Sequence, residues 1–171
     1  MFNKIFKLII AGLIIAYAVY QFWEGEIGNG IFLILLSLIF IFLYFRNEMI
    51  LLAFLRMRKQ DLIGTQKWLS KISNPEAALT TKQQGYYNYL HGIIFSQTNL
   101  TKAEKYFKKA LKLGLTMDYD LAMAKLSLAG ISMQKRRKRE ATKLLQEAKK
   151  LDKNNMLTDQ IKMMQQQMKK I

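Results

Sequence analysis

The sequence has no cysteine, one proline and one histidine among its 171 residues. The absence of cysteine excludes disulfides, thiolate metal ligands and cysteine nucleophiles. With a single proline to interrupt helices, the chain is predicted to be all-α. Acidic residues are also scarce, because 12 Asp and Glu stand against 27 Lys and Arg, which gives a formal net charge of +15. A single soluble domain rarely combines such a charge with a hydrophobic content of 51%.

The apolar residues and the positive charge lie in different parts of the chain. Residues 1–45 hold two lysines and two glutamates, so residues 46–171 carry the entire positive excess. A neutral, apolar segment is therefore followed by a strongly basic one. We predict two domains with a boundary at residues 45 and 46.

Two long apolar runs, residues 5–23 and 27–45, fill the first domain. The second run, IGNGIFLILLSLIFIFLYF, contains no charged residue. About 20 apolar residues in a helix span the hydrocarbon core of a bilayer. The runs are joined by a short turn that contains Glu24, Gly25 and Glu26. The sequence therefore predicts a transmembrane helical hairpin over residues 1–45.

Positive charges predict the orientation of this hairpin. Lys4 and Lys7 lie at the start of the first run, and Arg46 follows the second, whereas the connecting turn has no cation. By the positive-inside rule, both termini are expected to be cytoplasmic. The expected location is the inner (cytoplasmic) membrane of a bacterium, which rests on the family resemblance described below and not on the charges. A cleaved signal peptide is the alternative for the first run, since residues 1–18 imitate one. The basic domain is expected to be cytoplasmic in either case.

The basic domain contains a weak internal repeat of helix, turn and helix. Small and apolar side chains recur at a spacing of 38 residues, in the pairs Ala103 and Ala141, Phe107 and Leu145, and Ala110 and Ala148. A poorer copy, Gly64 and Trp68, lies 39 residues before Ala103 and Phe107. Another amphipathic stretch precedes each copy. Such a period is typical of stacked helix pairs.

Over residues 46–153 the pattern resembles the tetratricopeptide-repeat family, whose signature is W-x2-L-G-x2-Y, then A-x3-F, then P. The second unit offers Tyr87, Leu90, His91, Ile94, Ala103, Phe107 and Ala110. The third offers Leu128, Ala129, Ala141, Leu145 and Ala148, and the first offers Leu51, Leu55, Gly64, Trp68 and Pro75. The resemblance implies an α-solenoid of about three helix pairs.

In that solenoid the units would cover residues 46–75, 80–114 and 118–153, followed by a capping helix over 156–171. The apolar stripe of the last segment suits such a cap, because a terminal helix needs one polar face. A generic stack of helix pairs is the alternative, since the period of 38 exceeds the 34 residues of the family.

Local signals predict where several of these helices begin and end. Thr101 and Glu104 match a T-x-x-E capping box, and Thr81 and Gln84 repeat that signal. Asp61 is expected to cap the helix that contains Trp68. Gly114 is expected to end the helix that starts near Thr101, because glycine is favoured after the last helical turn.

The resemblance implies a concave groove that binds a protein partner. Its expected lining residues are Asn88, Tyr89, Phe95, Ser96, Met123, Leu126 and Met133. Methionine suits adaptable peptide-binding surfaces. Packing within and between the repeats is the alternative for each of these residues.

Five consecutive cations, Lys135, Arg136, Arg137, Lys138 and Arg139, fall at the turn of the third unit. A solvated turn is one interpretation of this basic run. The other is attraction to an anionic lipid surface, to RNA or a ribosome, or to an acidic protein. Charge alone does not choose among these partners.

No arrangement of side chains in the sequence indicates catalysis or a cofactor. The one histidine, His91, lies on a predicted helix and is interpreted as a structural residue. No close carboxylate pair, glycine-rich phosphate loop or metal-ligand spacing is found. We therefore predict a non-enzymatic, membrane-tethered scaffold or adaptor, or an accessory subunit of an inner-membrane complex, without a small-molecule substrate. The alternative is a ribosome, RNA or anionic-lipid tether.

Overall fold

A computed structural model describes residues 4–45 and 47–168, and all side chains in these ranges except those at positions 4, 5, 7, 43 and 45. Every regular element in the described ranges is a helix, which confirms the all-α prediction. The chain forms two compact units, Met1–Leu51 and Leu52–Ile171. Each unit is described below by itself.

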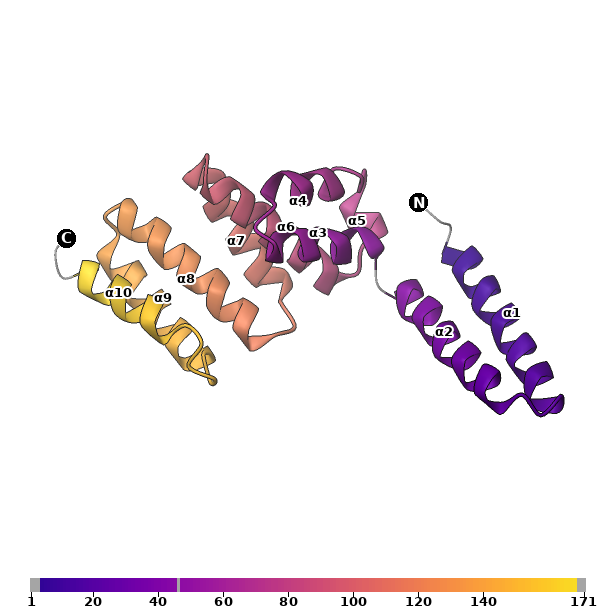
Figure 1. Cartoon of the computed structure of the whole chain (residues 1–171). Coiled ribbons are helices and arrows are strands. Elements are labelled where there is room, and N and C mark those ends of the chain that lie inside the picture. The colour runs from indigo at the N-terminus through magenta and orange to yellow at the C-terminus, as the bar shows by residue number, and fades with distance from the viewer. Residues whose placement is uncertain (1–3, 46, 169–171) are drawn as a thin grey trace. The chain divides into compact units, whose positions relative to one another are not determined.

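The first unit contains a hairpin of two long helices, α1 (Lys4–Trp23) and α2 (Ile27–Phe45). Figure 1 shows the two helices running alongside each other in indigo and purple. Gly25 makes the turn with a φ of +83°, a conformation that glycine adopts without strain. The helices pack through the small side chains of Ala11, Ala18 and Ser37, which are all buried.

Apolar side chains are exposed around the rest of the hairpin. Four of them, Ile31, Phe32, Ile34 and Leu35, lie within little more than one turn of α2 and therefore point in nearly every direction away from the seam. Exposed apolar side chains also occur along α1, at Leu8, Ile9, Leu13, Ile15 and Val19. Within the residues that the structure describes, no helix satisfies both the length and the hydropathy expected of a membrane span.

The second unit is a chain of helices that pack mainly on their neighbours in sequence. The boundary between the two units falls within α3 (Glu48–Arg58). The second unit continues with α4 (Leu62–Leu69), the short α5 (Pro75–Ala78), α6 (Thr81–Ser96), α7 (Leu100–Leu113), α8 (Asp118–Gln134), α9 (Lys138–Leu151) and α10 (Thr158–Met168). Helix α6 packs on α7, α7 on α8, and α8 on α9, while α4 also contacts α6 (Figure 1).

The predicted ends of two helices are confirmed. The Asp61 carboxylate accepts a hydrogen bond from the Gly64 N–H at 2.7 Å and caps α4. Gly114 follows the last residue of α7 with a φ of +86°. Both residues satisfy or end backbone hydrogen bonding at a helix terminus, as their chemistry favours.

The two predicted capping boxes are wrong by one or two residues. Helix α7 begins at Leu100 because the Asn99 side chain accepts a hydrogen bond from Lys102 N at 2.9 Å, so Thr101 is already helical. Helix α6 is capped by Thr80, not Thr81. In each case a polar residue earlier in the chain caps the helix. Glu104 is therefore not needed for a capping box in α7 and makes other contacts.

The core follows one register in α4 and the residues just after it, in α7 and in α9. The fully or nearly fully buried residues are Thr65, Leu69 and Ile72, then Ala103, Phe107 and Ala110, then Ala141, Leu145 and Ala148. All three sets are related by a spacing of 38 residues. The first set starts one residue later than the expected Gly64 and Trp68. Trp68 is only half-buried, and the Lys71 ammonium lies 4.0 Å from the centre of its ring.

The last pair is covered by α10. Leu157, Ile161 and Met168 are buried in one cluster with Leu126 and Leu145, among other residues. Helix α10 contacts both α8 and α9. The apolar stripe that the sequence shows after residue 156 thus packs inward, up to the last described residue.

Two glycines inside helices lie close to side chains of other helices, one of them a rigid ring and the other a flexible methionine. A Cβ atom on Gly92 would lie 2.7 Å from the Phe107 ring, whereas one on Gly130 would meet only the terminal methyl group of Met164 at 2.8 Å. Gly92→Ala is expected to lower the free energy of unfolding by about 1–2 kcal/mol, because the buried ring must move. Gly130→Ala is the matched control and is expected to be neutral or stabilising by up to about 1 kcal/mol, since the methionine end is flexible and alanine favours helix.

Chemical denaturation in detergent, followed by circular dichroism, measures this difference. Equal effects of the two substitutions would contradict the close approach of α6 to α7 at Gly92.

Candidate functional site

The structure places most of the predicted groove residues in internal packing. Asn88, Tyr89, Leu126 and Met133 are buried. Phe95, Ser96 and Met123 are half-buried. Four of the seven side chains are therefore not available to line an open groove in this conformation.

Hydrogen bonds and ring contacts account for several of these positions. The Asn88 amide donates to the Gln84 carbonyl at 2.7 Å, and the Ser96 hydroxyl donates to the Ile93 carbonyl at 2.6 Å. The Tyr89 ring packs edge-on against Phe107, with 6.0 Å between ring centres. These contacts join neighbouring turns or join α6 to α7. Among the predicted groove residues, Phe95 belongs to a different surface feature, an aromatic cluster.

Phe95 belongs to an aromatic cluster made by Tyr87, His91 and Phe95 of α6 and Tyr106 of α7. The Tyr106 ring stacks on His91 and on Phe95, with 5.1 Å and 5.3 Å between ring centres. Tyr87 contacts His91 edge-on at 4.5 Å. All four residues are half-buried, so the cluster offers ring surface at the side of the α6–α7 pair.

Spacing was the available signal for this cluster. Tyr87, His91 and Phe95 follow one another at intervals of four residues and so share one face of α6. His91, considered by itself, does not predict the cluster. The Lys102 ammonium lies 5.4 Å from the centre of the Phe95 ring and adds a cation at the edge of the cluster.

The environment of His91 in the cluster disfavours the charged imidazole. Burial lowers the pKa of its imidazole below the ordinary value of 6.5. Its Nε2 atom is buried and has no hydrogen-bond partner among the described residues. A buried polar atom without a partner costs about 1–3 kcal/mol, which offsets part of the stability that the ring contacts of His91 provide.

His91→Phe is expected to raise the free energy of unfolding by about 1 kcal/mol, because it keeps the ring stack and removes the unpaired nitrogen. His91→Ala is the matched control and should be destabilising, since it removes the ring. Denaturation in detergent at neutral pH measures both. A loss of stability in His91→Phe as large as in His91→Ala would mean that the nitrogen has a partner after all.

The basic run meets a carboxylate from the preceding helix pair. Glu104 of α7 is 8% exposed. Its two carboxylate oxygens accept hydrogen bonds from Lys108 at 2.7 Å, Lys135 at 2.6 Å and Arg137 at 2.8 Å. Lys108 and then Lys135 contribute most to lowering the pKa of Glu104 to about 2. The Glu104 cluster thus ties α7 to the turn between α8 and α9.

Only part of the basic run is therefore free to meet a ligand. Lys135 and Arg137 contact Glu104, whereas Arg136, Lys138 and Arg139 are exposed and make no ion pair with the described residues. The turn has Arg136 in the left-handed region, with a φ of +57°. The predicted patch of five cations is reduced to three by internal pairing.

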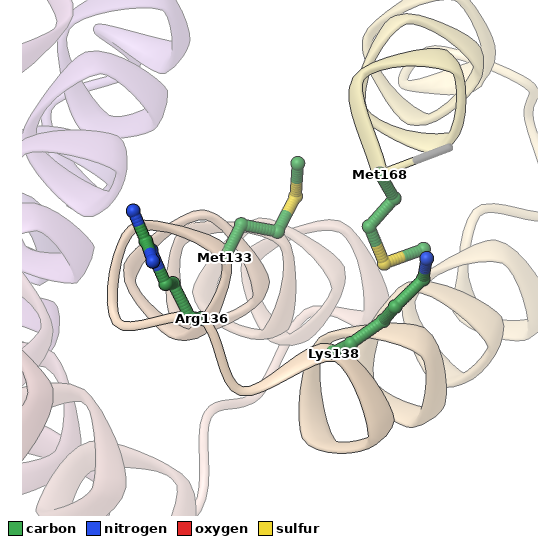
Figure 2. Close-up of a pocket in the computed structure, with 4 residues that line it drawn as sticks. All are labelled: Met133, Arg136, Lys138 and Met168. Carbon is green, nitrogen blue, oxygen red and sulfur yellow. The ribbon is translucent and has the colours of Figure 1, made fainter. Parts of the chain in front are cut away.

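Figure 2 shows the surface beside this turn. Lys138 points toward Met168 of α10, and Arg136 points away on the other side of Met133. These four side chains line a hollow that leaves no room for a water molecule. The surface beside the turn is therefore closed, and its exposed chemistry is that of the cations.

A second polar contact joins α6 to α8. The Tyr86 hydroxyl donates to the buried Asp120 carboxylate at 2.8 Å and accepts from the Thr116 N–H at 3.3 Å. Burial raises the pKa of Asp120, although the Tyr86 hydrogen bond opposes that effect. Asp118, by contrast, is exposed and pairs with Lys153 at 2.6 Å. Both acids lie in the first turn of α8, and they serve different contacts.

Within the described ranges, no group of three or more His, Asp or Glu side chains is arranged to hold a metal ion. No known protein family, no curated protein and no solved structure matches the chain. The class of protein that the fold defines is thus an all-α chain with an apolar helical hairpin and a separate, basic helical unit.

Proposed function

We propose that this chain is a membrane-anchored, non-enzymatic adaptor whose helical unit binds a protein partner. The observation that carries the proposal is the exposure of apolar side chains around the α1–α2 hairpin, beside a second unit with its own buried core. A helix that is apolar on every side is stable in a core or in a bilayer. In sequence, α2 is an uncharged run of 19 residues, and a helix needs about 20 apolar residues to span a bilayer.

The helical unit is proposed to be a tetratricopeptide-like solenoid of three helix pairs. The support is the shared register of buried residues in α4, α7 and α9, at a spacing of 38 residues. Contacts mainly between consecutive helices also suit a repeat architecture, in which each unit packs on its neighbours. Such stacks present long surfaces that suit protein binding.

The aromatic cluster is the proposed contact for the partner. It combines half-buried rings, an unpaired imidazole nitrogen and a nearby lysine. Aromatic side chains are enriched at the centres of protein interfaces, because they bury a large area at a low cost in side-chain entropy.

Affinity purification of the full-length chain from native membranes in mild detergent tests the proposal. The wild type is compared with Phe95→Glu, which places a charge in the aromatic cluster, after washes at low and high salt. One or a few proteins are expected to persist at high salt with the wild type and to be lost with Phe95→Glu.

Tyr119→Glu is the matched control, because Tyr119 is an exposed aromatic residue in the first turn of α8. It is expected to retain the partner, and circular dichroism checks that both variants fold. Loss of the same proteins from both variants, or from neither, would contradict binding at the aromatic cluster. Retention by both and loss on exchange of the hairpin for an unrelated anchor would indicate an accessory subunit held by the hairpin.

A second candidate is a tether for RNA or the ribosome. The observation that favours it is a row of exposed lysines, Lys67, Lys105 and Lys143, which recur at the 38-residue spacing on α4, α7 and α9 and have no ion pair among the described residues. Binding through such charges falls steeply as salt rises. RNA and ribosomal proteins that dominate at low salt and vanish at high salt would support this candidate over the adaptor.

A further inference from the structure

Helix α3 has an exposed face that is apolar at one end and basic at the other. Leu51, Leu55 and Arg58 follow at intervals of four and three residues, so they share one side of the helix, and all three are exposed. Its buried side is formed by Ile50 and Ala53. The exposed leucines therefore point away from the packing of α3.

The next helix adds to this apolar surface. Ile63, in the first turn of α4, is 85% exposed. Large apolar side chains are rarely this exposed, and an exposed apolar patch often marks a surface that a partner or a membrane covers. Between Leu55 and Ile63 the chain carries Arg56, Arg58 and Lys59. The exposed apolar residues of the first pair thus flank a cluster of cations.

These cations are only partly neutralised by the chain itself. Arg56 pairs with the half-exposed Asp61 at 3.4 Å. The Arg58 guanidinium lies 5.4 Å from the centre of the Phe54 ring, and its charge also acts on the buried Asp120 carboxylate, where it opposes the rise in pKa that burial causes. Lys59 is exposed and makes no ion pair with the described residues. Exposed leucine and isoleucine beside cations is the composition of a helix that lies at a membrane surface.

Covalent continuity limits how far α3 can lie from the hairpin. Helix α2 ends at Phe45 and α3 begins at Glu48. Three residue steps of extended chain reach about 11 Å at most. With α2 in a bilayer, the start of α3 must therefore lie within or close to the headgroup region.

We infer that α3 and the start of α4 lie in the headgroup region of an anionic leaflet. Leu55 and Ile63 contact the acyl-chain boundary, and Arg56 and Lys59 contact lipid phosphates. This inference rests on the proposed membrane anchoring of the hairpin. It adds a second contact with the bilayer, which would restrict the orientation of the helical unit rather than leave that unit on a free linker.

Charge favours lipid over the other occupants of this face. A second copy of the chain would bring two strongly basic surfaces together, which is opposed by repulsion at a net charge of +15. A neutral apolar partner would leave the cations without a counterion. An anionic leaflet satisfies both the leucines and the cations.

Depth-dependent fluorescence quenching tests the inference on the full chain, because the sequence has no cysteine to interfere with labelling. Single substitutions Leu55→Cys and Ile63→Cys are labelled with bimane and reconstituted into phosphatidylcholine–phosphatidylglycerol liposomes. Ile39→Cys on α2 reports hairpin insertion, and Gln146→Cys on α9 is an exposed control. Lipids with a nitroxide near the headgroup or deep in the acyl chain serve as quenchers.

The labels at 55 and 63 are expected to be quenched by the shallow nitroxide at least about twofold more than the label at 146. This difference should shrink in liposomes of phosphatidylcholine alone, and Lys59→Glu should reduce it in the anionic liposomes. Quenching at 39 with no excess at 55 and 63 would overturn the inference and leave the anchoring intact. The absence of quenching at 39 would overturn both.

A third result concerns a protein occupant. Labels at 55 and 63 that are shielded from a water-soluble quencher but not quenched by either lipid would mean that protein covers the face. That result would also overturn the inference.

Discussion

Replacing Phe107 with alanine is expected to lower the free energy of unfolding of the helical unit by about 4 kcal/mol, the usual cost of removing a large ring from a closed core. Phe107 has no exposed surface. Its ring packs against Gly92 and edge-on against Tyr89, so backbone and side chain of α6 both meet it. The cavity left by this substitution would lie between α6 and α7.

Phe95→Ala is the matched control, since it removes a ring of the same size from the half-buried aromatic cluster of the same helix pair. It is expected to cost about 1–2 kcal/mol, because less area is buried there. Denaturant titration of the full chain in detergent, followed by circular dichroism, measures both variants. Similar losses for the two would contradict the burial of Phe107.

Glu104→Gln is expected to lower the free energy of unfolding by about 2 kcal/mol at neutral pH. The fall in the pKa of Glu104 from 4.5 to about 2 corresponds to roughly 3 kcal/mol. Solvent around Lys108 and Arg137, which are about half exposed, reduces that figure to about 2 kcal/mol. The substitution leaves three cations around a neutral amide.

The pH dependence gives this prediction a sign. Because the folded pKa of Glu104 is lowered, its contribution is fully present above the unfolded value of 4.5 and is lost as pH falls toward about 2. The wild type should therefore lose stability across that window relative to Glu104→Gln, and the two should converge near its lower end. A stability difference that does not change with pH would show that packing, not charge, is lost in the variant.

Glu140→Gln is the control for simple removal of a negative charge. Glu140 lies 3.5 Å from both Lys108 and Arg137 but is much more exposed than Glu104. Exposed ion pairs contribute about 0–1 kcal/mol, so this variant should change stability by less than half as much. An equal effect would mean that the net charge of the region, and not the buried position of Glu104, sets its stability.

The sequence predicted the second helices of each pair better than the first. In α7 and α9 the buried residues other than Glu104 are small or apolar and the exposed ones are mostly lysines, so the helical period is plain. Helix α6 buries polar residues as well, among them Gln83 and Asn88. A helix that is enclosed on several sides has no clear apolar stripe, so the sequence does not indicate which of its residues are buried, as with Asn88 and Tyr89.

The contacts of the basic run could not be predicted from the sequence, because they depend on tertiary structure. Lys135 and Arg137 meet a carboxylate more than 30 residues earlier in the chain. The same glutamate had a local explanation as part of a capping box, which the earlier Asn99 cap makes unnecessary. The aromatic cluster could likewise be predicted only in part. The spacing of its members on α6 is visible in the sequence, but the stacking of Tyr106 on His91 and Phe95 requires the packing of α7 on α6.

Site-specific labelling in intact cells tests the proposed topology most directly. Glu26→Cys in the hairpin turn and Lys143→Cys on α9 are each introduced into the cysteine-free chain and treated with a membrane-impermeant maleimide. The account predicts labelling at 26 in intact cells and labelling at 143 only after the membrane is opened. Equal labelling at the two positions before opening, or recovery of the chain without membranes, would contradict a hairpin that spans the bilayer and anchors a cytoplasmic helical unit.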